Sequence, residues 1–265
     1  MKQFAVILDW DGVLADSFKN QFEWFHYWAK HPSNKGNKKV PYTDVEEFKI
    51  FYNKQTFKEG GVQNVYDALG LDCDMSDKNH PVWNAYIDFK ERNPVKIFPE
   101  MTKIVKEAYK LGRLSSNNNV RLRLSINTSN HWKTMETPLK KSGIIDCFDS
   151  YVDSQVLNEV DGSNASKHIH KPSKISVAYS LGYLGSEGNN TLFFGDTLND
   201  LQATRDVVVP YVRNKQNLIC VGVTWGFETE QRLKEGINTQ FGTYHFNHII
   251  SEKIGVLNLI ENYFK

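Results

Sequence analysis

The strongest constraint on the fold is a set of short, uninterrupted apolar runs, each of which meets polar residues where it ends. The first run covers residues 4–8 and is followed at once by Asp9. Three more occupy residues 122–126, 191–194 and 218–223. Runs of this kind are typical of strands that are buried on both faces of a parallel sheet. The chain therefore predicts four central strands with polar residues just beyond the ends of several of them.

Helical patterns separate these runs. Residues 101–111 and 175–181 carry apolar side chains at helical spacing, and Gly112 and Gly182 follow them. A glycine directly after the last periodic residue commonly ends a helix. The alternation of strands and helices predicts an α/β fold, namely a Rossmann-like, mainly parallel sheet with helices on both faces.

The segment 17–93 has a different pattern and contains no convincing buried strand. Its aromatic residues recur at helical spacing: Phe18, Phe22, Phe25, Phe48, Phe51, Tyr52, Trp83 and Tyr86. Burial requires this spacing, so we interpret these residues as the core of a small helical bundle and not as a cofactor site. Thr43 and Glu46 have the spacing of a capping box before one of the helices. We expect an inserted helical cap domain at 17–93 and an α/β core formed by 1–16 and 94–265.

The composition argues against several functional classes. The net charge of the 265 residues is +1, without a concentrated basic block, so we expect no nucleic-acid partner. The 3 cysteines form no C-x-x-C pair, which argues against a disulfide framework or a zinc site and favours a reducing compartment. The apolar run near the N-terminus is too short for a signal peptide, and no stretch approaches the about 20 apolar residues of a membrane span. We therefore expect a cytoplasmic protein without a membrane partner, whose oligomeric state does not follow from the sequence.

Acidic residues follow two of the predicted buried strands. Asp9 and Asp11 come after the first strand, and Asp196 and Asp200 come after the strand at 191–194. Open α/β sheets bind ligands just outside the carboxyl ends of their strands. Carboxylates this close repel one another unless a cation or a proton lies between them, and a hard ion such as Mg²⁺ prefers oxygen ligands. Either pair alone could be an ordinary turn, but if the two strands are neighbours, the four acids converge on one magnesium site.

Two smaller features complete the candidate site. Thr128, Ser129 and Asn130 end the strand at 122–126, where a hydroxyl and free backbone N–H groups can bind a phosphate oxygen. The alternative is that they cap a helix, which serine and threonine favour in any case. Lys171 precedes Pro172 and a helix that we expect to begin near Ser173. This lysine is either a second phosphate ligand or an ordinary surface lysine.

Taken in order, these features resemble the haloacid dehalogenase superfamily of aspartate-nucleophile hydrolases. The segments that carry the resemblance are Asp9-Trp10-Asp11-Gly12-Val13-Leu14, Thr128-Ser129, Lys171-Pro172 and Gly195-Asp196-Thr197-Leu198-Asn199-Asp200. The segments Ile97-Phe98-Pro99, Phe148-Asp149 and Gly222-Val223-Thr224-Trp225-Gly226-Phe227 look most like the phosphoglycolate phosphatase-like branch. The resemblance covers roughly residues 1–16 and 97–260, and the helical segment stands where that family has its cap.

The resemblance implies a role for each residue. Asp9 is expected to attack phosphorus and form an aspartyl-phosphate, and Asp11 to act as the acid and then the base. Mg²⁺ is expected to be held by the Asp9 carboxylate, the Asp11 backbone carbonyl and Asp196, with Asp200 ligating or orienting a bound water. Thr128 and Lys171, together with the neighbouring Ser129, are expected to hold the phosphoryl oxygens, while the cap excludes water and selects the leaving group.

The leading hypothesis is a phosphatase that acts on a small phosphorylated metabolite. A sugar phosphomutase shares the same core motifs, so the sequence barely separates the two. A 2-haloacid dehalogenase does not need a leaving-group acid such as Asp11, and a non-catalytic phosphate-binding protein does not need the complete set of motifs. The loop before Lys171 is longer than usual and contains His168 and His170. These histidines could reach the site, although histidines in loops are more often solvated.

Overall fold

The computed structural model describes residues 2–56, 62–77, 79–114, 120–161, 169–186, 190–207, 218–240 and 242–264. The chain divides into two compact units. The first consists of Met1–Ala15 and Lys96–Lys265, and the second is Asp16–Val95. The second unit is thus inserted into the first.

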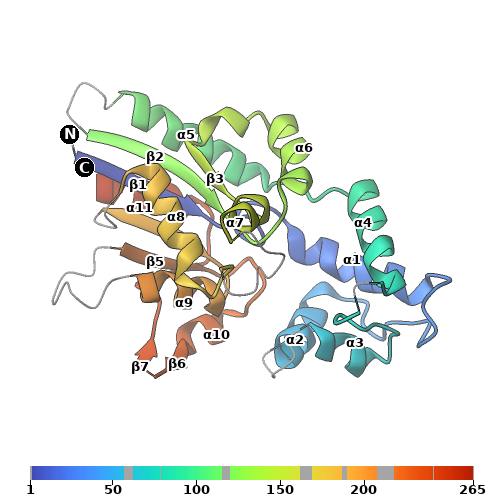
Figure 1. Cartoon of the computed structure of the whole chain (residues 1–265). Coiled ribbons are helices and arrows are strands. Elements are labelled where there is room, and N and C mark those ends of the chain that lie inside the picture. The colour runs from blue at the N-terminus through green and yellow to red at the C-terminus, as the bar shows by residue number, and fades with distance from the viewer. Residues whose placement is uncertain are drawn as a thin grey trace. The chain divides into compact units, whose positions relative to one another are not determined.

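The first unit contains a six-stranded sheet (Figure 1). Its strands are β1 (Lys2–Leu8), β2 (Val120–Asn127), β3 (Ser150–Val152), β4 (Thr191–Gly195), β5 (Leu218–Val223) and β8 (His248–Ile250). They lie in the order β3-β2-β1-β4-β5-β8, and every neighbouring pair is parallel. The four apolar runs of the sequence form the four central strands, which confirms the predicted parallel sheet. The short edge strands β3 and β8 were not predicted.

Helices cover both faces of this sheet (Figure 1). Helices α5 (Pro99–Leu114) and α11 (Ile254–Phe264) pack together on one face, while α8 (Lys174–Leu184) and α9 (Leu198–Val207) pack together on the other. The remaining elements are α6 (Trp132–Ser142), the 3₁₀ helix η2 (Ile145–Cys147), α7 (Ser154–Asp161), α10 (Glu230–Glu235), and the hairpin of β6 (Ile237–Thr239) and β7 (Gly242–Tyr244).

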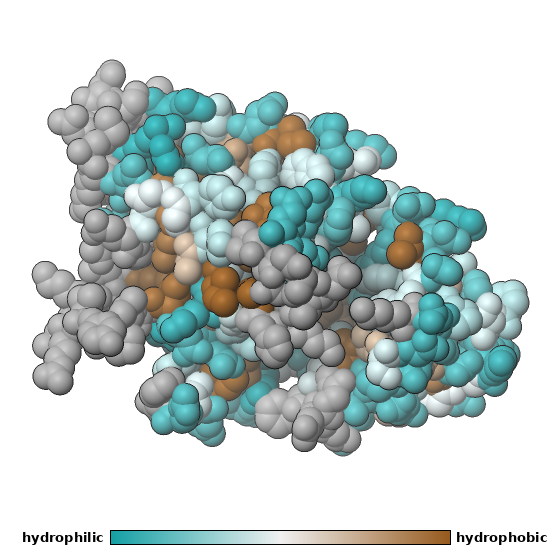
Figure 2. Space-filling view, in the orientation of Figure 1, coloured by the Kyte–Doolittle hydropathy of each residue, from teal (hydrophilic) through white to brown (hydrophobic). Residues whose placement is uncertain are grey.

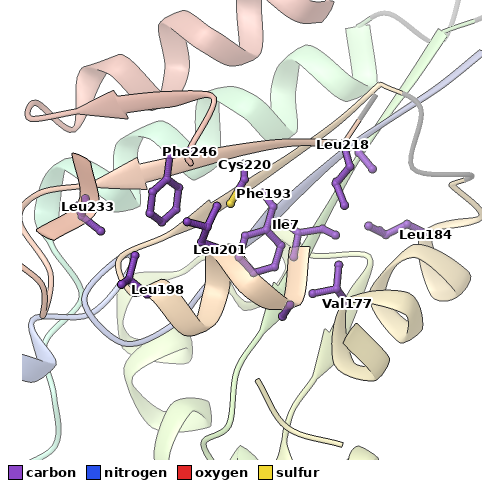
Figure 3. Close-up of a cluster of buried hydrophobic side chains, with 12 residues drawn as sticks. Ile7, Val177, Leu184, Phe193, Leu198, Leu201, Leu218, Cys220, Leu233 and Phe246 are labelled. Carbon is purple, nitrogen blue, oxygen red and sulfur yellow. The ribbon is translucent and has the colours of Figure 1, made fainter. Parts of the chain in front are cut away.

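The core between the sheet and α8–α9 is continuous (Figure 3). Side chains of the central strands, among them Ile7, Phe193 and Cys220, are fully buried there. They pack against Val177 of α8 and Leu201 of α9. Because the central strands are buried on both faces, their sequences are continuously apolar. The packed core fixes the carboxyl ends of these strands.

Two predicted helix ends were wrong. Helix α5 continues through Gly112 to Leu114. A Cβ atom at Gly112 would lie 2.8 Å from the carbonyl oxygen of Leu122. This glycine therefore permits close packing of α5 on β2 and does not stop the helix. Helix α8 likewise continues through Gly182 to Leu184 and is capped by Gly185, whose φ is +59°.

Helix α8 is apolar on its outer side as well as its inner side. Ile175 is 37% exposed and Tyr183 is 55% exposed. In Figure 2 a hydrophobic area lies over α8 and α9, on a face that is otherwise mostly hydrophilic. Because the outer side of α8 is apolar as well, its sequence lacks the alternation of apolar and polar faces that is typical of a surface helix. The end of α8 is therefore hard to predict from the sequence.

The second unit consists, among the described residues, of helices only: α1 (Ser17–Lys30), α2 (Val45–Thr56), α3 (Gln63–Leu69) and α4 (Pro81–Arg92). Its core is aromatic, as predicted. The rings of Phe25 and Phe48 lie 5.4 Å apart, and the Trp24 indole N–H donates to the Tyr66 hydroxyl at 2.6 Å. None of the helices described in either unit is both long and apolar enough to cross a membrane.

The predicted capping box at the start of α2 was wrong. Asp44 caps the helix, since its Oδ1 accepts hydrogen bonds from the backbone N–H groups of Glu46 and Glu47, both at 2.9 Å. The helix begins at Val45, one residue later than a cap at Thr43 would place its first helical residue. Aspartate and threonine both favour this position, so the sequence alone left the choice open.

Candidate active site

Three aspartates meet at the carboxyl end of the sheet. Asp9 follows β1, Asp196 follows β4, and Asp200 lies in the first turn of α9. Strands β1 and β4 are direct neighbours, and the backbone N–H of Asp9 donates to the carbonyl of Phe194 at 2.9 Å. One carboxylate oxygen from each aspartate lies within 4.8 Å of the others. All three side chains are buried, so their charges are held in a poorly solvated place.

Lys171 lies among these carboxylates. Its Nζ is 2.7 Å from Asp9 Oδ1 and 2.6 Å from Asp200 Oδ1. The same ammonium group donates to the backbone carbonyl of Asn127 at 3.2 Å. Its side chain is only 7% exposed, so the alternative of a surface lysine was wrong. Ser173 caps α8 as expected, because its hydroxyl accepts from the N–H of Ile175 at 3.3 Å.

The electrostatics of the cluster favour a further positive charge. Burial raises the pKa of Asp9 to about 8; Asp200 and Asp11 push it in the same direction, and Lys171 opposes them. Burial and the carboxylate of Asp9 also hold the pKa of Asp196 well above its usual range. Burial by itself would lower the pKa of Lys171, but Asp200 and Asp9 more than offset that effect and raise it. One lysine thus leaves the carboxylates undercompensated, which is the situation that a bound cation relieves.

Asp196 is oriented so that one of its oxygens stays available. Its Oδ2 accepts the backbone N–H of Phe227 at 2.6 Å. Its Oδ1 is buried and has no hydrogen-bond partner in the described part of the chain. A Cβ atom at Gly12 or Gly226 would lie 2.0 or 2.2 Å from Asp196 Oδ2, so two glycines make room for this carboxylate. A buried, unpartnered carboxylate oxygen is costly unless a ligand such as a metal ion uses it.

Asp200 connects the loop after β4 to Lys171. Its Oδ2 accepts from the hydroxyl of Thr197 at 2.7 Å, from the N–H of Thr197 at 3.1 Å and from the N–H of Asp196 at 3.2 Å. Its Oδ1 pairs with Lys171. The carboxylate therefore holds the loop that carries Asp196 and, at the same time, the ammonium group of the lysine.

The side chain of Asp11 does not belong to the group of three. It is half-buried, and its Oδ2 accepts a hydrogen bond from the side-chain amide of Asn130. The two acid pairs predicted that four carboxylates converge on one ion. In the structure three of the four lie together. The ligand implied by the family resemblance at this position is the backbone carbonyl of Asp11, and that assignment stays a prediction.

Thr128 is buried at the end of β2, and Ser129 beside it is exposed. The hydroxyl of Thr128 accepts the backbone N–H of Asn130 at 3.1 Å, so its own O–H remains able to donate. The alternative that Thr128 and Ser129 cap the next helix was wrong. Helix α6 begins at Trp132, and its N-cap is His131, whose Nδ1 accepts from the N–H of Lys133 at 3.2 Å.

Several residues whose side chains hold the site were assigned no side-chain role from the sequence. Asn130 is one, because an asparagine in a loop carries no recognisable signal. Glu228 is another, since its Oε1 accepts the N–H of Leu198 at the start of α9 at 2.9 Å. The segment around Trp225 was noted only for its family resemblance, yet the indole N–H of Trp225 donates to the carbonyl of Val13 at 3.3 Å. This segment therefore connects the loop after β5 to the loop after β1.

Two histidines, His168 and His170, come shortly before Lys171 in the sequence. His168 lies outside the described residues. His170 precedes Lys171 and is half-buried, and burial followed by the charge of Lys171 lowers its pKa. Its Nδ1 is buried without a hydrogen-bond partner in the described part of the chain. No functional role follows for either residue.

The sequence model of the haloacid dehalogenase-like hydrolase family matches residues 6–213, which include every candidate site residue. The chain belongs to this family. Among curated proteins, no sequence matches this haloacid dehalogenase-like hydrolase significantly.

Solved structures share the fold of this haloacid dehalogenase-like hydrolase at low sequence identity. A haloacid dehalogenase-like family protein from Streptococcus pneumoniae is 18% identical, with a TM-score of 0.62 and 97% of each chain covered. A predicted phosphoglycolate phosphatase from Haemophilus somnus is 16% identical, with a TM-score of 0.65, 98% of this chain and 99% of that chain covered. A candidate β-phosphoglucomutase from Thermotoga maritima is 17% identical, with a TM-score of 0.60 and the same coverage. These similarities establish the α/β fold.

Proposed function

We propose that the protein is a magnesium-dependent phosphatase that hydrolyses a small phosphorylated metabolite through an aspartyl-phosphate intermediate. The observation that carries this proposal is the buried group of Asp9, Asp196 and Asp200, whose carboxylate oxygens lie within 4.8 Å of one another, with Lys171 bonded to two of them. The arrangement combines a fixed carboxylate nucleophile with positive charge where a phosphoryl group would bind. Phosphoryl transfer needs little beyond positioning and charge neutralisation of this kind.

The residues present fit a magnesium ion. All the candidate ligands are oxygens, and Asp196 Oδ1 is buried without a hydrogen-bond partner in the described chain. The ion would be held by Asp9 and Asp196, with the backbone carbonyl of Asp11 and with Asp200 as ligand or as partner of a bound water. When bound, Mg²⁺ supplies positive charge that neutralises the carboxylates and the phosphoryl oxygens.

The side chains divide the reaction between them. The Asp9 carboxylate attacks phosphorus and forms a new O–P bond, while the P–O bond to the alcohol breaks and its electron pair leaves with the alcohol oxygen. Asp11 gives a proton to that oxygen. In the second step Asp11 accepts a proton from water, which attacks the aspartyl-phosphate and regenerates Asp9. The O–H of Thr128 and the ammonium group of Lys171 hold phosphoryl oxygens during both steps, and the exposed Ser129 provides a further donor beside Thr128.

The structural neighbours support a phosphorylated substrate. One carries the description of a phosphoglycolate phosphatase and another that of a β-phosphoglucomutase. Both descriptions name a small phosphorylated metabolite as the substrate class. Cleavage of a carbon–halogen bond would leave the acid Asp11 and the buried carboxylate group without a purpose, so we do not favour the dehalogenase alternative.

The proposal is tested by measuring release of inorganic phosphate from 4-nitrophenyl phosphate and from a panel of phosphorylated metabolites. We expect turnover that requires Mg²⁺, stops in excess chelator and is abolished in Asp9→Asn. Undiminished turnover in that variant would contradict the nucleophile. Isomerisation of a sugar phosphate without net phosphate release would instead identify a mutase.

A further inference from the structure

The contact between Asn130 and Asp11 joins two loops at the carboxyl end of the sheet. Asn130 lies three residues beyond the end of β2, and Asp11 lies three residues beyond the end of β1. The Nδ2 of Asn130 donates to Oδ2 of Asp11 across 119 positions of sequence. Strands β1 and β2 are direct neighbours, so both loops are anchored in the rigid part of the sheet.

The backbone of Asn130 is held independently of this side chain. Its N–H donates to the hydroxyl of Thr128 at 3.1 Å, and its carbonyl accepts the N–H of Ser154 at 2.9 Å. The N–H of Thr128 in turn donates to the carbonyl of Val152 at 2.9 Å. At position 130 these bonds use backbone atoms only and do not involve the side-chain amide. The amide group is therefore not required to shape the loop, and its contact with Asp11 calls for another explanation.

The direction of the hydrogen bond has a chemical consequence. In a protonated carboxyl group the carbonyl oxygen is a better acceptor than the hydroxyl oxygen, so the bond from Asn130 to Oδ2 favours the form of Asp11 that carries its proton on Oδ1. The bond also restricts rotation of the carboxyl group. Asn130 thus favours Oδ1 as the oxygen that holds the proton and helps to fix the direction in which that oxygen faces.

We propose that Asn130 is a positioning residue for acid catalysis by Asp11, and this inference rests on the proposed function. In the step concerned, the Asp9 oxygen forms a bond to phosphorus, the bond from phosphorus to the leaving oxygen breaks, and the leaving oxygen takes the proton from Asp11 Oδ1. Without the amide, the carboxyl group loses one of the contacts that orient it, and a smaller fraction of its orientations places the proton at the leaving oxygen.

Substituted phenyl phosphates test this role, because their leaving groups differ in basicity but hardly in shape. The measured quantity is kcat/KM, which covers binding and departure of the leaving group but not hydrolysis of the aspartyl-phosphate. A strongly basic leaving group needs the proton, whereas 4-nitrophenolate leaves without it. For Asn130→Ala we expect kcat/KM to fall about 10–100-fold on phenyl phosphate and less than about 3-fold on 4-nitrophenyl phosphate, within the about 10²–10⁴-fold that general acids contribute.

Two further variants separate positioning from packing. Asn130→Asp keeps the shape of the side chain but replaces the donor by an oxygen, so we expect a loss at least as selective for basic leaving groups. Asn238→Ala removes an amide from the exposed β6–β7 hairpin, where Thr243 donates to it at 2.7 Å, and should follow the wild type on every substrate. Thermal unfolding curves establish that each variant is folded.

Each outcome has a definite meaning. A larger loss on basic leaving groups in both Asn130 variants supports the proposal. An equal loss on all phenyl phosphates, or an Asn130→Asp variant as active as the wild type, overturns it while the proposed function stands. If the wild type releases phosphate from no substrate, the proposed function fails and the inference fails with it.

Discussion

Binding of Mg²⁺ should displace a proton from Asp9. The pKa of this carboxyl group is raised to about 8 in the metal-free protein, chiefly by burial. At pH 7 a group with that pKa is about 0.9 protonated, and at pH 9 only about 0.1. Because a metal ligand must be deprotonated, Mg²⁺ binding at pH 7 should release about 0.9 proton from Asp9. Asp196, whose pKa is also raised, can only add to this number.

Isothermal titration in buffers with different ionisation enthalpies measures this release directly. The slope of the observed enthalpy against the buffer enthalpy gives the number of protons. Asp9→Asn has no proton to lose at this position, so we expect fewer protons to be released in this variant than in the wild type. A difference near zero at pH 7, or one that does not shrink between pH 7 and pH 9, would refute the assignment of Asp9 as a buried metal ligand.

The same shift has a consequence for stability, with a sign that can be checked. The pKa of Asp9 is raised on folding from 3.8 to about 8, so the folded state binds the proton more tightly than the unfolded state. Its contribution to stability is complete below pH about 4 and is lost as the pH rises towards 8. In the absence of metal, Asp9→Asn should therefore gain thermal stability relative to the wild type across this range. Added Mg²⁺ should stabilise the wild type more at pH 8 than at pH 5.

Three further predictions concern single residues. Gly226→Ala places a Cβ atom 2.2 Å from Asp196 Oδ2, so we expect a folded protein whose Mg²⁺ affinity falls at least about tenfold in titration calorimetry, in line with the effect of residues that orient metal ligands. Lys171→Met leaves Asp9 and Asp200 without their shared cation; phosphate release should be lost, and denaturant unfolding without metal at pH 8 should show a loss of about 3 kcal/mol that Mg²⁺ partly restores. Phe193→Ala, at a fully buried position of the central strand β4, should lower the free energy of unfolding by about 3–5 kcal/mol, and a loss below about 1 kcal/mol would contradict the core described above.

The central sheet could be predicted because its signal is local. Each of the four central strands is buried on both faces, so each appears in the sequence as a continuous apolar run. The edge strands β3 and β8 have 3 residues each and pair on one side only, which leaves too little apolar sequence for detection. Helix ends were less reliable. Gly112 has the same sequence signal as a helix stop, and only the nearby carbonyl of Leu122 reveals that it serves close packing.

The candidate site could be predicted in part. Asp9 and Asp196 follow strands, and the carboxyl ends of parallel neighbours meet at one edge of the sheet, so chain order was sufficient to bring them together. Lys171 was ambiguous, because nothing in the sequence distinguishes a buried lysine among carboxylates from a solvated one before a helix. Asn130 follows Thr128 and Ser129 in the sequence, but nothing there indicated its contact with Asp11.

The sequence by itself determined the class of fold, the aromatic core of the inserted unit and the residues that could carry the chemistry, because periodicity and motif order depend on neighbours along the chain. Only the tertiary structure decided which oxygen of each carboxylate is engaged. Asp196 uses Oδ2 for Phe227 and leaves Oδ1 unpartnered among the described residues, while Asp11 uses Oδ2 for Asn130. These choices depend on hydrogen bonds across 31 and 119 positions, and bonds over such separations form only when the sheet has brought its loops together.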